Sequence, residues 1–440
     1  MSEKPAPVIY GQTFDCPCGR THRIEPHQGV YADDAMAQLP EICDRYAGGG
    51  AAAVLMDTRT RHVAGDAVAA QLRRDGRQVE CLVVGDRPGG HWPACDDVTF
   101  AMLAPRIASK GLVVSVGSGV INDLGKWLAG EAGIPFVSFA TAASMNGYTS
   151  SNVAPTLKGV KSLISGRAAA AVLAQPRIIR DAPYELTAAG LGDVLAKSVS
   201  SADWLANHLL FGDYYCQRAV DLIRDIEPLY LQSPRDLPAR SPAAIDALFE
   251  ALMLTGAAMT MAESSAPASG GEHLISHCLD MMASRDGCEH DLHGRQVGLG
   301  TVIAAELYRR LMELDSPRWT DAPPAVDRAF WGPLSDEVAG QYAAKQQRLA
   351  DARRMLAQGG AWDELRSRLA PMLRPPGMIR TCLAEAHAAW RAEDIACDRP
   401  RVLAAVRHAH GIRPRFTVLD LANLAGIMPA AADEIVANWT

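Results

Sequence analysis

Three histidines and one aspartate stand at spacings that suit a metal site. His273 and His277 are four residues apart in SGGEHLISHCLD, so on a helix they share one face. His293 begins the segment HGRQVG, and Asp193 lies upstream in GLGD. One carboxylate and two or three imidazoles hold a divalent cation and leave a coordination position open for a substrate oxygen. Zinc and nickel suit these ligands, and iron is not excluded; taken alone, the histidine pair is equally typical of solvated or capping residues.

A glycine-rich turn carries the second chemical signal. An apolar run leads into Gly117-Ser118-Gly119, and a helical pattern follows. Glycine allows close backbone approach, and amides at a helix start hold an anion such as a pyrophosphate. The third glycine of the GxGxxG pattern is missing, so a plain strand-to-helix turn stays an alternative.

Asp57 ends an earlier apolar run and is a candidate for contacting the ribose hydroxyls of an adenosine. Its alternative role is a helix N-cap. Because Arg59 and Arg61 lie nearby and would tolerate a ribose phosphate, the choice between NAD and NADP stays open.

Alternating strands and helices must position the glycine-rich turn. Helical patterns occur at Arg61–Arg74, near Val98–Ser109 and up to about Ala132. Strands are predicted at Ala52–Asp57, Val79–Val84, Leu112–Val116 and Pro135–Phe139, with a late strand at Arg177–Asp181. Strands that alternate with helices indicate a parallel sheet covered on both faces.

The sequence becomes helical after Pro183. Helices are predicted at Thr187–Leu210, Pro242–Ser264, Glu272–Ser284, Arg295–Leu314, Asp336–Gln358 and Trp362–Leu369. We therefore expect a Rossmann-like, NAD(P)-binding α/β domain over residues 1–182 and an all-helical, metal- and substrate-binding domain over residues 183–440. A cleft between two such halves is where small-molecule sites tend to lie.

Composition narrows the function classes. The 440 residues include 43 Lys and Arg against 50 Asp and Glu, a net charge of −7, which argues against a nucleic-acid-coating protein. The chain shows no apparent apolar run of membrane-spanning length and no apolar signal core at its start. Ten cysteines are too sparse for a disulfide scaffold. A cytoplasmic enzyme with mostly reduced thiols is expected.

The ordered set of motifs resembles a known family. The GSG turn, TAAS at Thr141–Ser144, GLGD, EHxxxH and HGxQVG occur in that order. Together they resemble the sn-glycerol-1-phosphate dehydrogenases, and most closely the bacterial AraM-like branch. That family lies in the superfamily of iron-containing alcohol dehydrogenases, glycerol dehydrogenase and dehydroquinate synthase. The resemblance runs from about residue 15 to the end and includes the early CxCGxxH stretch and Arg415–Met428.

The resemblance implies roles for individual residues. It places a divalent metal on Asp193, His273 and His293, with His277 near the substrate. It places NAD or NADP on the glycine turn, on the TAAS segment and on the acid at the adenosine end. In this sequence those cofactor positions are Asp57, Gly117, Ser118, Gly119, Val120, Ile121, Thr141, Ser144 and Ser150.

Two positions depart from the family pattern. Asn146 stands where the family commonly has an aspartate, and Arg295 replaces the glutamate of HGEQVG. Asn146 can still hydrogen-bond a substrate hydroxyl but cannot take a proton at neutral pH. We interpret Arg295 as a solvated helix residue, with a preference for a more anionic substrate as the alternative.

The implied reaction is hydride transfer between NAD(P)H and glycerone phosphate or sn-glycerol 1-phosphate, with the metal polarising the carbonyl. Alternatives are a related polyol dehydrogenase, a lyase or cyclase of the dehydroquinate synthase type, and a nucleotide-binding protein without activity. Lys197, one helical turn from Asp193, is a candidate for the substrate phosphate or a surface lysine. A homodimer is expected by analogy.

Cys16, Cys18 and His22 place three metal-type ligands close together. A structural zinc needs a fourth ligand, and none is obvious nearby in the sequence. The interpretation favoured here is a strand turn with free thiols.

Overall fold

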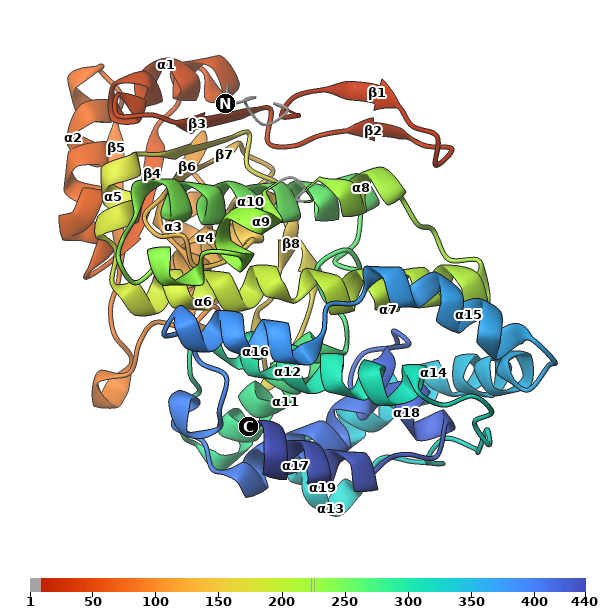
Figure 1. Ribbon diagram of the computed structural model, residues 1–440. Coiled ribbons are helices and arrows are strands. Elements are labelled where there is room, and N and C mark those ends of the chain that lie inside the picture. Colours follow the sequence, from red (N-terminus) through yellow and green to blue (C-terminus); the bar gives the residue numbers. More distant parts are fainter. Residues whose placement is uncertain (1–8, 223, 225) are drawn as a thin grey trace.

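The computed structural model describes residues 9–222, 224 and 226–440 (Figure 1). A six-stranded sheet forms the first half, and every pair of neighbouring strands in it is parallel. In spatial order the strands are β3 (Gln28–Tyr31), β12 (Ala171–Ala174), β7 (Phe136–Ala140), β6 (Leu112–Gly117), β4 (Ala52–Asp57) and β5 (Val79–Val84). The predicted parallel α/β sheet is confirmed.

Helices cover both faces of this sheet, which explains its continuous apolar strands. Residues of β4 alternate between the two faces of the sheet. Val54 packs with α1 (Ala35–Ala47) and α2 (Asp66–Arg74) on one face. Its neighbour Leu55 packs with α3 (Asp97–Ile107) and α4 (Gly119–Ala132). A strand buried on both sides needs no polar alternation, because neither face meets water.

One predicted strand is wrong. Arg177–Asp181 belongs to helix α5 (Pro176–Asp181), and the strand of this region is the preceding run, β12. Pro176 stands in the first helical turn, where its missing N–H costs no hydrogen bond. The four residues of β12 are fully buried between β3 and β7, so burial selected the alanine-rich run as the strand.

The second half is helical. The predicted helices correspond to α6 (Tyr184–Leu195), α7 (Lys197–Phe211), α10 (Pro242–Ala262), α11 (Gly271–Asp286), α12 (His293–Met312), α14 (Ser335–Leu356) and α15 (Ala361–Leu369). The expected single helix at Thr187–Leu210 is two helices that separate at Ala196. Further helices are α8 (Gln217–Asp221), α9 (Glu227–Leu231), α13 (Arg328–Trp331), α16 (Pro376–Glu385), α17 (Arg399–His408), α18 (Val418–Leu424) and α19 (Ala430–Trp439). The division into domains at residue 182 stays a prediction.

Helix α10 corrects the expectation that no segment is long and apolar enough to cross a membrane. Its 21 residues pass that test by length and composition. However, 83% of the apolar stretch is buried inside the protein, as in the core helix of a soluble fold.

Small antiparallel ribbons join the two halves. The hairpin of β1 (Thr13–Asp15) and β2 (Thr21–Arg23) extends from the sheet toward α8 (Figure 1). Two short ribbons follow β7, one pairing β8 (Asn152–Val153) with β11 (Ile164–Ser165) and one pairing β9 (Thr156–Leu157) with β10 (Val160–Lys161). Residues from the N-terminal part of the chain therefore contact the helical half directly.

Candidate active site

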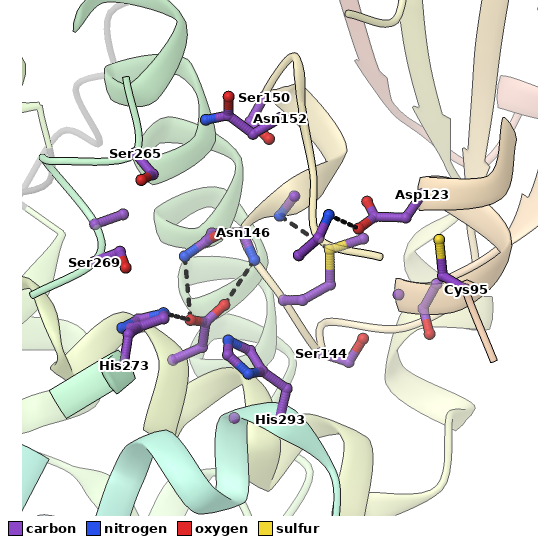
Figure 2. Close-up of a pocket in the computed structure, with 18 of the residues that line it drawn as sticks. Cys95, Asp123, Ser144, Asn146, Ser150, Asn152, Ser265, Ser269, His273 and His293 are labelled. Atoms are coloured by element: carbon purple, nitrogen blue, oxygen red, sulfur yellow. Dashed lines mark hydrogen bonds and ion pairs between the residues drawn. The ribbon is translucent and has the colours of Figure 1, made fainter. Parts of the chain in front are cut away.

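A cavity of about 2300 Å³ lies between the two halves of the protein. Its lining includes Gly119 from α4 on one side and His273 from α11 on the other. Figure 2 shows Asp123 and Cys95 on one side of this pocket and His273 and His293 on the other. Drug-sized ligands occupy roughly 300–1000 Å³, so this cavity has room for a dinucleotide together with a second molecule.

The predicted metal ligands converge in the structure. One ligand atom each from Asp193, His273 and His293 lies within 4.8 Å of the other two. They come from α6, α11 and α12, three helices that are far apart in sequence. Nε2 of His273 lies 3.5 Å from Oδ1 of Asp193. The three side chains line the cavity, so the cluster is open toward it.

Glycines allow the helices that carry these ligands to meet. A Cβ atom on Gly192 would lie 2.0 Å from the carbonyl oxygen of Gly294, and one on Gly294 would lie 2.0 Å from that of Ala189. Helices α6 and α12 therefore touch backbone to backbone at these points. The glycines of the GLGD and HG motifs thus set the separation between Asp193 and His293.

Hydrogen bonds fix the orientation of both histidine rings. Nδ1 of His273 lies 2.8 Å from Oε1 of Glu272. An ionised carboxylate only accepts hydrogen bonds, so Nδ1 is the donor. The Ser276 hydroxyl donates to Gln296 and so accepts from Nδ1 of His293 at 3.3 Å. In its neutral form each ring therefore carries the proton on Nδ1, which leaves the lone pair on Nε2.

The electrostatics of the cluster favour a positive charge. Burial opposes a charged His273 ring, but the carboxylates of Asp193 and Glu272 outweigh it and raise the pKa of His273 to about 9. Burial and the neighbouring His273 lower the pKa of His293 to about 4. A site that holds one extra positive charge among buried carboxylates is suited to a cation.

Asn146 contacts the carboxylate of Asp193 rather than standing free. Its backbone N–H donates to Oδ2 of Asp193 at 2.8 Å, and its side-chain amide donates to Oδ1 at 3.1 Å (Figure 2). An aspartate here could not donate the second bond and would place a like charge beside Asp193. The amide therefore holds the Asp193 carboxylate in place.

His277 lies beside the cluster and lines the cavity. Burial, followed by the charge of Arg413, holds the pKa of His277 well below its usual range, so the ring is neutral. Its Nδ1 atom has no hydrogen-bond partner within the described parts of the chain. Asp280, which the sequence analysis missed, forms a second group of candidate ligands with His277 and His293. Asp280 follows His277 by three residues on α11, a helical spacing that could have revealed it.

The predicted cofactor residues lie along the other side of the cavity. Gly117 is the exception, since a Cβ there would lie 2.7 Å from Ile121 and the residue is packed inside the turn. Asp57 lines the cavity, and its Oδ1 also accepts from the backbone amides of Arg59 and Thr60 at 2.8 and 2.6 Å. The remaining members that line the cavity are Ser118, Gly119, Val120, Ile121, Thr141, Ser144 and Ser150.

Two basic residues differ from their expected settings. Lys197 is buried away from the cavity lining, where its ammonium donates to the carbonyl of Ala219 at 3.1 Å. It is therefore not placed to hold a substrate phosphate. Arg295 is half-buried and pairs with Asp291 at 2.8 Å, so it is tied to its own helix start rather than freely solvated.

Arg413 and Lys161 supply positive charge to the cavity instead. The side chain of Arg413 forms no hydrogen bond or ion pair within the described residues, and burial, followed by Arg415, lowers its pKa to about 10. Lys161 lies 3.9 Å from Asp280. Their positions far apart in sequence gave no motif by which they could have been found.

Known proteins resemble this chain over most of its length. Residues 30–183 match the family described as iron-containing alcohol dehydrogenase. The chain is 29% identical over 416 residues to a glycerol-1-phosphate dehydrogenase, NAD(P)+, of Bacillus licheniformis, covering 94% of this chain and 93% of that one. It is 31% identical over 290 residues to a protein of the same name from Thermococcus kodakarensis, covering 66% of this chain and 80% of that one.

Solved structures share the fold. A probable glycerol dehydrogenase from Sinorhizobium meliloti aligns with a TM-score of 0.60 at 15% identity, covering 94% of this chain and 99% of that one. A glycerol dehydrogenase from Schizosaccharomyces pombe aligns with a TM-score of 0.59 at 14% identity, covering 94% and 92%. These solved structures show the fold alone, whereas the sequence relatives show the family. The chain belongs to the glycerol-1-phosphate dehydrogenase family.

Proposed function

We propose that this protein is a metal-dependent oxidoreductase that transfers hydride between NAD(P)H and glycerone phosphate or sn-glycerol 1-phosphate. The observation that carries the proposal is the convergence of Asp193, His273 and His293 in a cavity that continues to the glycine turn before α4. The names of the sequence relatives support the same substrate pair and the same cofactors.

The donor set fits one divalent cation. Asp193 offers an anionic oxygen, and His273 and His293 each present Nε2 because their Nδ1 atoms are engaged elsewhere. Three protein ligands leave an open position, which separates a catalytic from a structural site. Zinc or nickel is the proposed metal, with iron compatible with the same ligands. When bound, the cation supplies a Lewis acid for the substrate carbonyl, and the nicotinamide supplies or accepts hydride.

The α/β half would hold the dinucleotide. Helix α4 begins at Gly119, and a Cβ at that residue would meet nothing within 4 Å, so the space before the helix is open. The amides and the positive end of this helix suit a pyrophosphate. Asp57 lies at the end of β4 with one carboxylate oxygen held by backbone amides, and it would contact the ribose hydroxyls.

The substrate would bind between the cluster and the basic residues. Arg413 offers a guanidinium without an acidic partner in the described chain, which suits a phosphate dianion. The neutral His277 ring would accept a hydrogen bond from a substrate hydroxyl or donate one to it. Because its pKa is low, the ring is a poor proton carrier. Asn146 keeps Asp193 oriented, and the proton that completes the product hydroxyl would come from water in the cavity.

We further propose that the enzyme acts in the cytoplasm as a homodimer with a small phosphorylated ketone or polyol as its partner molecule. The family and the mostly buried α10 support a soluble enzyme. Sedimentation at several concentrations tests the dimer.

The decisive experiment follows NADH and NADPH oxidation with glycerone phosphate by the chelated protein, with and without added zinc or nickel. We expect metal-dependent oxidation with stoichiometric ketone reduction, and a much lower rate with unphosphorylated dihydroxyacetone. Equal rates with both ketones would indicate a polyol dehydrogenase. Metal-dependent turnover of another substrate without net NAD(P)H consumption would instead support a lyase or cyclase.

A further inference from the structure

A second group of metal-type side chains lies under the N-terminal hairpin. Cys16, Cys18 and His22 belong to the β1–β2 hairpin, and Cys216 is the N-cap of α8. One ligand atom of each lies within 4.8 Å of the other three. We propose that these four residues hold a structural zinc ion that fastens the hairpin to the helical half.

The distances match the edges of a tetrahedron. Zinc–sulfur bonds of about 2.3 Å and zinc–nitrogen bonds of about 2.0–2.1 Å require sulfurs about 3.8 Å apart and sulfur–nitrogen pairs about 3.5 Å apart. The sulfurs of Cys16 and Cys216 are 3.8 Å apart. Nε2 of His22 lies 3.2 Å from the sulfur of Cys18 and 3.6 Å from that of Cys216. These three distances are close to the edges of such a tetrahedron, and the remaining pairs of ligand atoms lie within 4.8 Å of one another.

The tautomer of His22 fits this role. Its Nδ1 lies 3.0 Å from the backbone carbonyl of Met261, which can only accept. Nδ1 therefore carries the proton, and Nε2 presents its lone pair to the three sulfurs. A backbone carbonyl that fixes a ligating imidazole in this way is the usual arrangement around protein-bound zinc. His22 is 3% exposed, and besides the sulfurs the hydroxyl of Tyr214 lies 3.5 Å from Nε2.

The local backbone brings the ligands together. The amide of Gly19 donates to the carbonyl of Cys16 at 2.9 Å, and the amide of Cys16 donates to the carbonyl of Arg20 at 3.0 Å. Gly19 has φ +87°, a value that favours glycine, so the turn folds the two cysteines to one side. The fourth ligand is 194 residues from His22, which is why local spacing could not reveal it.

The ligand set indicates a structural rather than a catalytic ion. Four protein ligands fill a tetrahedron and leave no open position. None of the four side chains is among those lining the large cavity. A disulfide between Cys16 and Cys216 would need sulfurs about 2.05 Å apart and would leave Cys18 and His22 unused.

The site also supports the cavity wall. The hydroxyl of Tyr214 lies 3.2 Å from the sulfur of Cys18, and the guanidinium of Arg20 stacks 3.6 Å from the Tyr214 ring. Arg20 and Tyr214 both line the cavity. Loss of the ion would therefore loosen a part of the cavity wall while leaving Asp193, His273 and His293 in place.

The test measures metal content and the cobalt spectrum of the full-length protein. After zinc loading and desalting, we expect about two metal ions per chain, one for each site. Cobalt substituted at the thiol site should give a near-ultraviolet thiolate-to-cobalt band, which the Asp–His–His site cannot produce. His273→Ala should lose one ion and keep the band, and Cys216→Ser should lose one ion together with the band.

Matched variants separate metal binding from misfolding. Cys288→Ser changes an exposed cysteine outside the cluster and should keep both the ion and the band. His22→Ala should lose the ion, whereas His22→Cys supplies a fourth thiolate and should recover it. A wild-type protein that binds cobalt without the thiolate band, or whose unreduced form contains a Cys16–Cys216 disulfide, would overturn the proposal. These outcomes are independent of turnover, so they do not depend on the proposed reaction.

Discussion

The two clusters of metal-type ligands differ in their ligand atoms and in their access to the cavity. Asp193, His273 and His293 offer one oxygen and two nitrogens, line a large cavity and leave one side of the cluster open. The cluster under the hairpin offers three sulfurs and one nitrogen within 4.8 Å of one another, and none of its four side chains lines the cavity. Ligand number and access to the cavity, rather than the presence of histidine, therefore distinguish a site for chemistry from a site for stability.

The groups that hydrogen-bond to the ligands also differ between the two clusters. In the cavity, buried carboxylates and an amide surround the ligands, so the charge and orientation of the cluster are adjusted by Glu272 and Asn146. Under the hairpin, a backbone carbonyl holds His22 and the sulfurs face one another. A cluster with tunable charge suits a reacting centre, whereas a closed cluster of soft ligands suits a fixed one.

The largest expected effect comes from removing a ligand of the cavity cluster. We expect His273→Ala to lower kcat/KM by at least about 1000-fold, since a Lewis acid contributes several kcal/mol to the transition state. The melting temperature of the zinc-loaded protein should change little by comparison. Steady-state kinetics and thermal denaturation check both statements, and a variant with near-normal turnover would remove this cluster from the mechanism.

Arg413 tests whether the cavity selects phosphorylated substrates. Replacing a charge-assisted contact worth about 1.5–3 kcal/mol should raise KM for glycerone phosphate by roughly 10- to 100-fold in Arg413→Ala. The rate with unphosphorylated dihydroxyacetone should stay nearly constant. An equal loss with both ketones would show that Arg413 shapes the cavity without contacting phosphate.

The pKa of His273 predicts how metal affinity depends on pH. In the metal-free protein this pKa is raised to about 9, so the ring must lose a proton before it binds a cation. Affinity at the cavity site should rise by roughly 50-fold between about pH 7 and 9 and then level off. The free energy of unfolding of the metal-free protein depends on pH in the opposite direction. The stabilisation from the charged ring is fully present below about pH 6.5 and is lost as pH rises through about 9.

Chelator competition across this pH range measures the affinity, and His273→Ala serves as its control. The variant should lose this part of the pH dependence together with the site. A flat profile in the wild type would mean that Asp193 and Glu272 do not hold a proton on the ring.

The smallest effect concerns Asn146, one of the two residues that depart from the family pattern. Asn146→Ala removes the side-chain hydrogen bond to Asp193 and keeps the backbone one. We expect metal affinity to fall by about tenfold, at the lower end of effects from residues that orient metal ligands. Added metal should restore most of the activity. If excess metal restores nothing, Asn146 contacts the substrate itself.

The sheet strands buried on both faces were predictable because burial on both sides demands continuous apolar runs. Ala52–Asp57 matches its expected strand residue for residue. Val79–Val84, a partly buried strand at the edge of the sheet, also matches. Arg177–Asp181 failed because short apolar runs fit a strand or a helix equally well, and packing between β3 and β7 selected Ala171–Ala174. From the sequence, Asn146 is able to hydrogen-bond a substrate hydroxyl, but the fold is needed to show that it donates to Asp193.

Sequence motifs alone identified the three residues of the cavity cluster and three of the four residues of the hairpin cluster, because each of these residues belongs to a recognisable local pattern. The tertiary structure was needed to show that Cys216 joins the hairpin cluster and that Arg413, rather than Lys197, supplies charge to the cavity. Both residues reach their sites through the packing of segments that are far apart in the chain, and not through local spacing. Which residues meet at each site therefore depends on the packing of the whole protein interior, and a local sequence pattern does not contain that information.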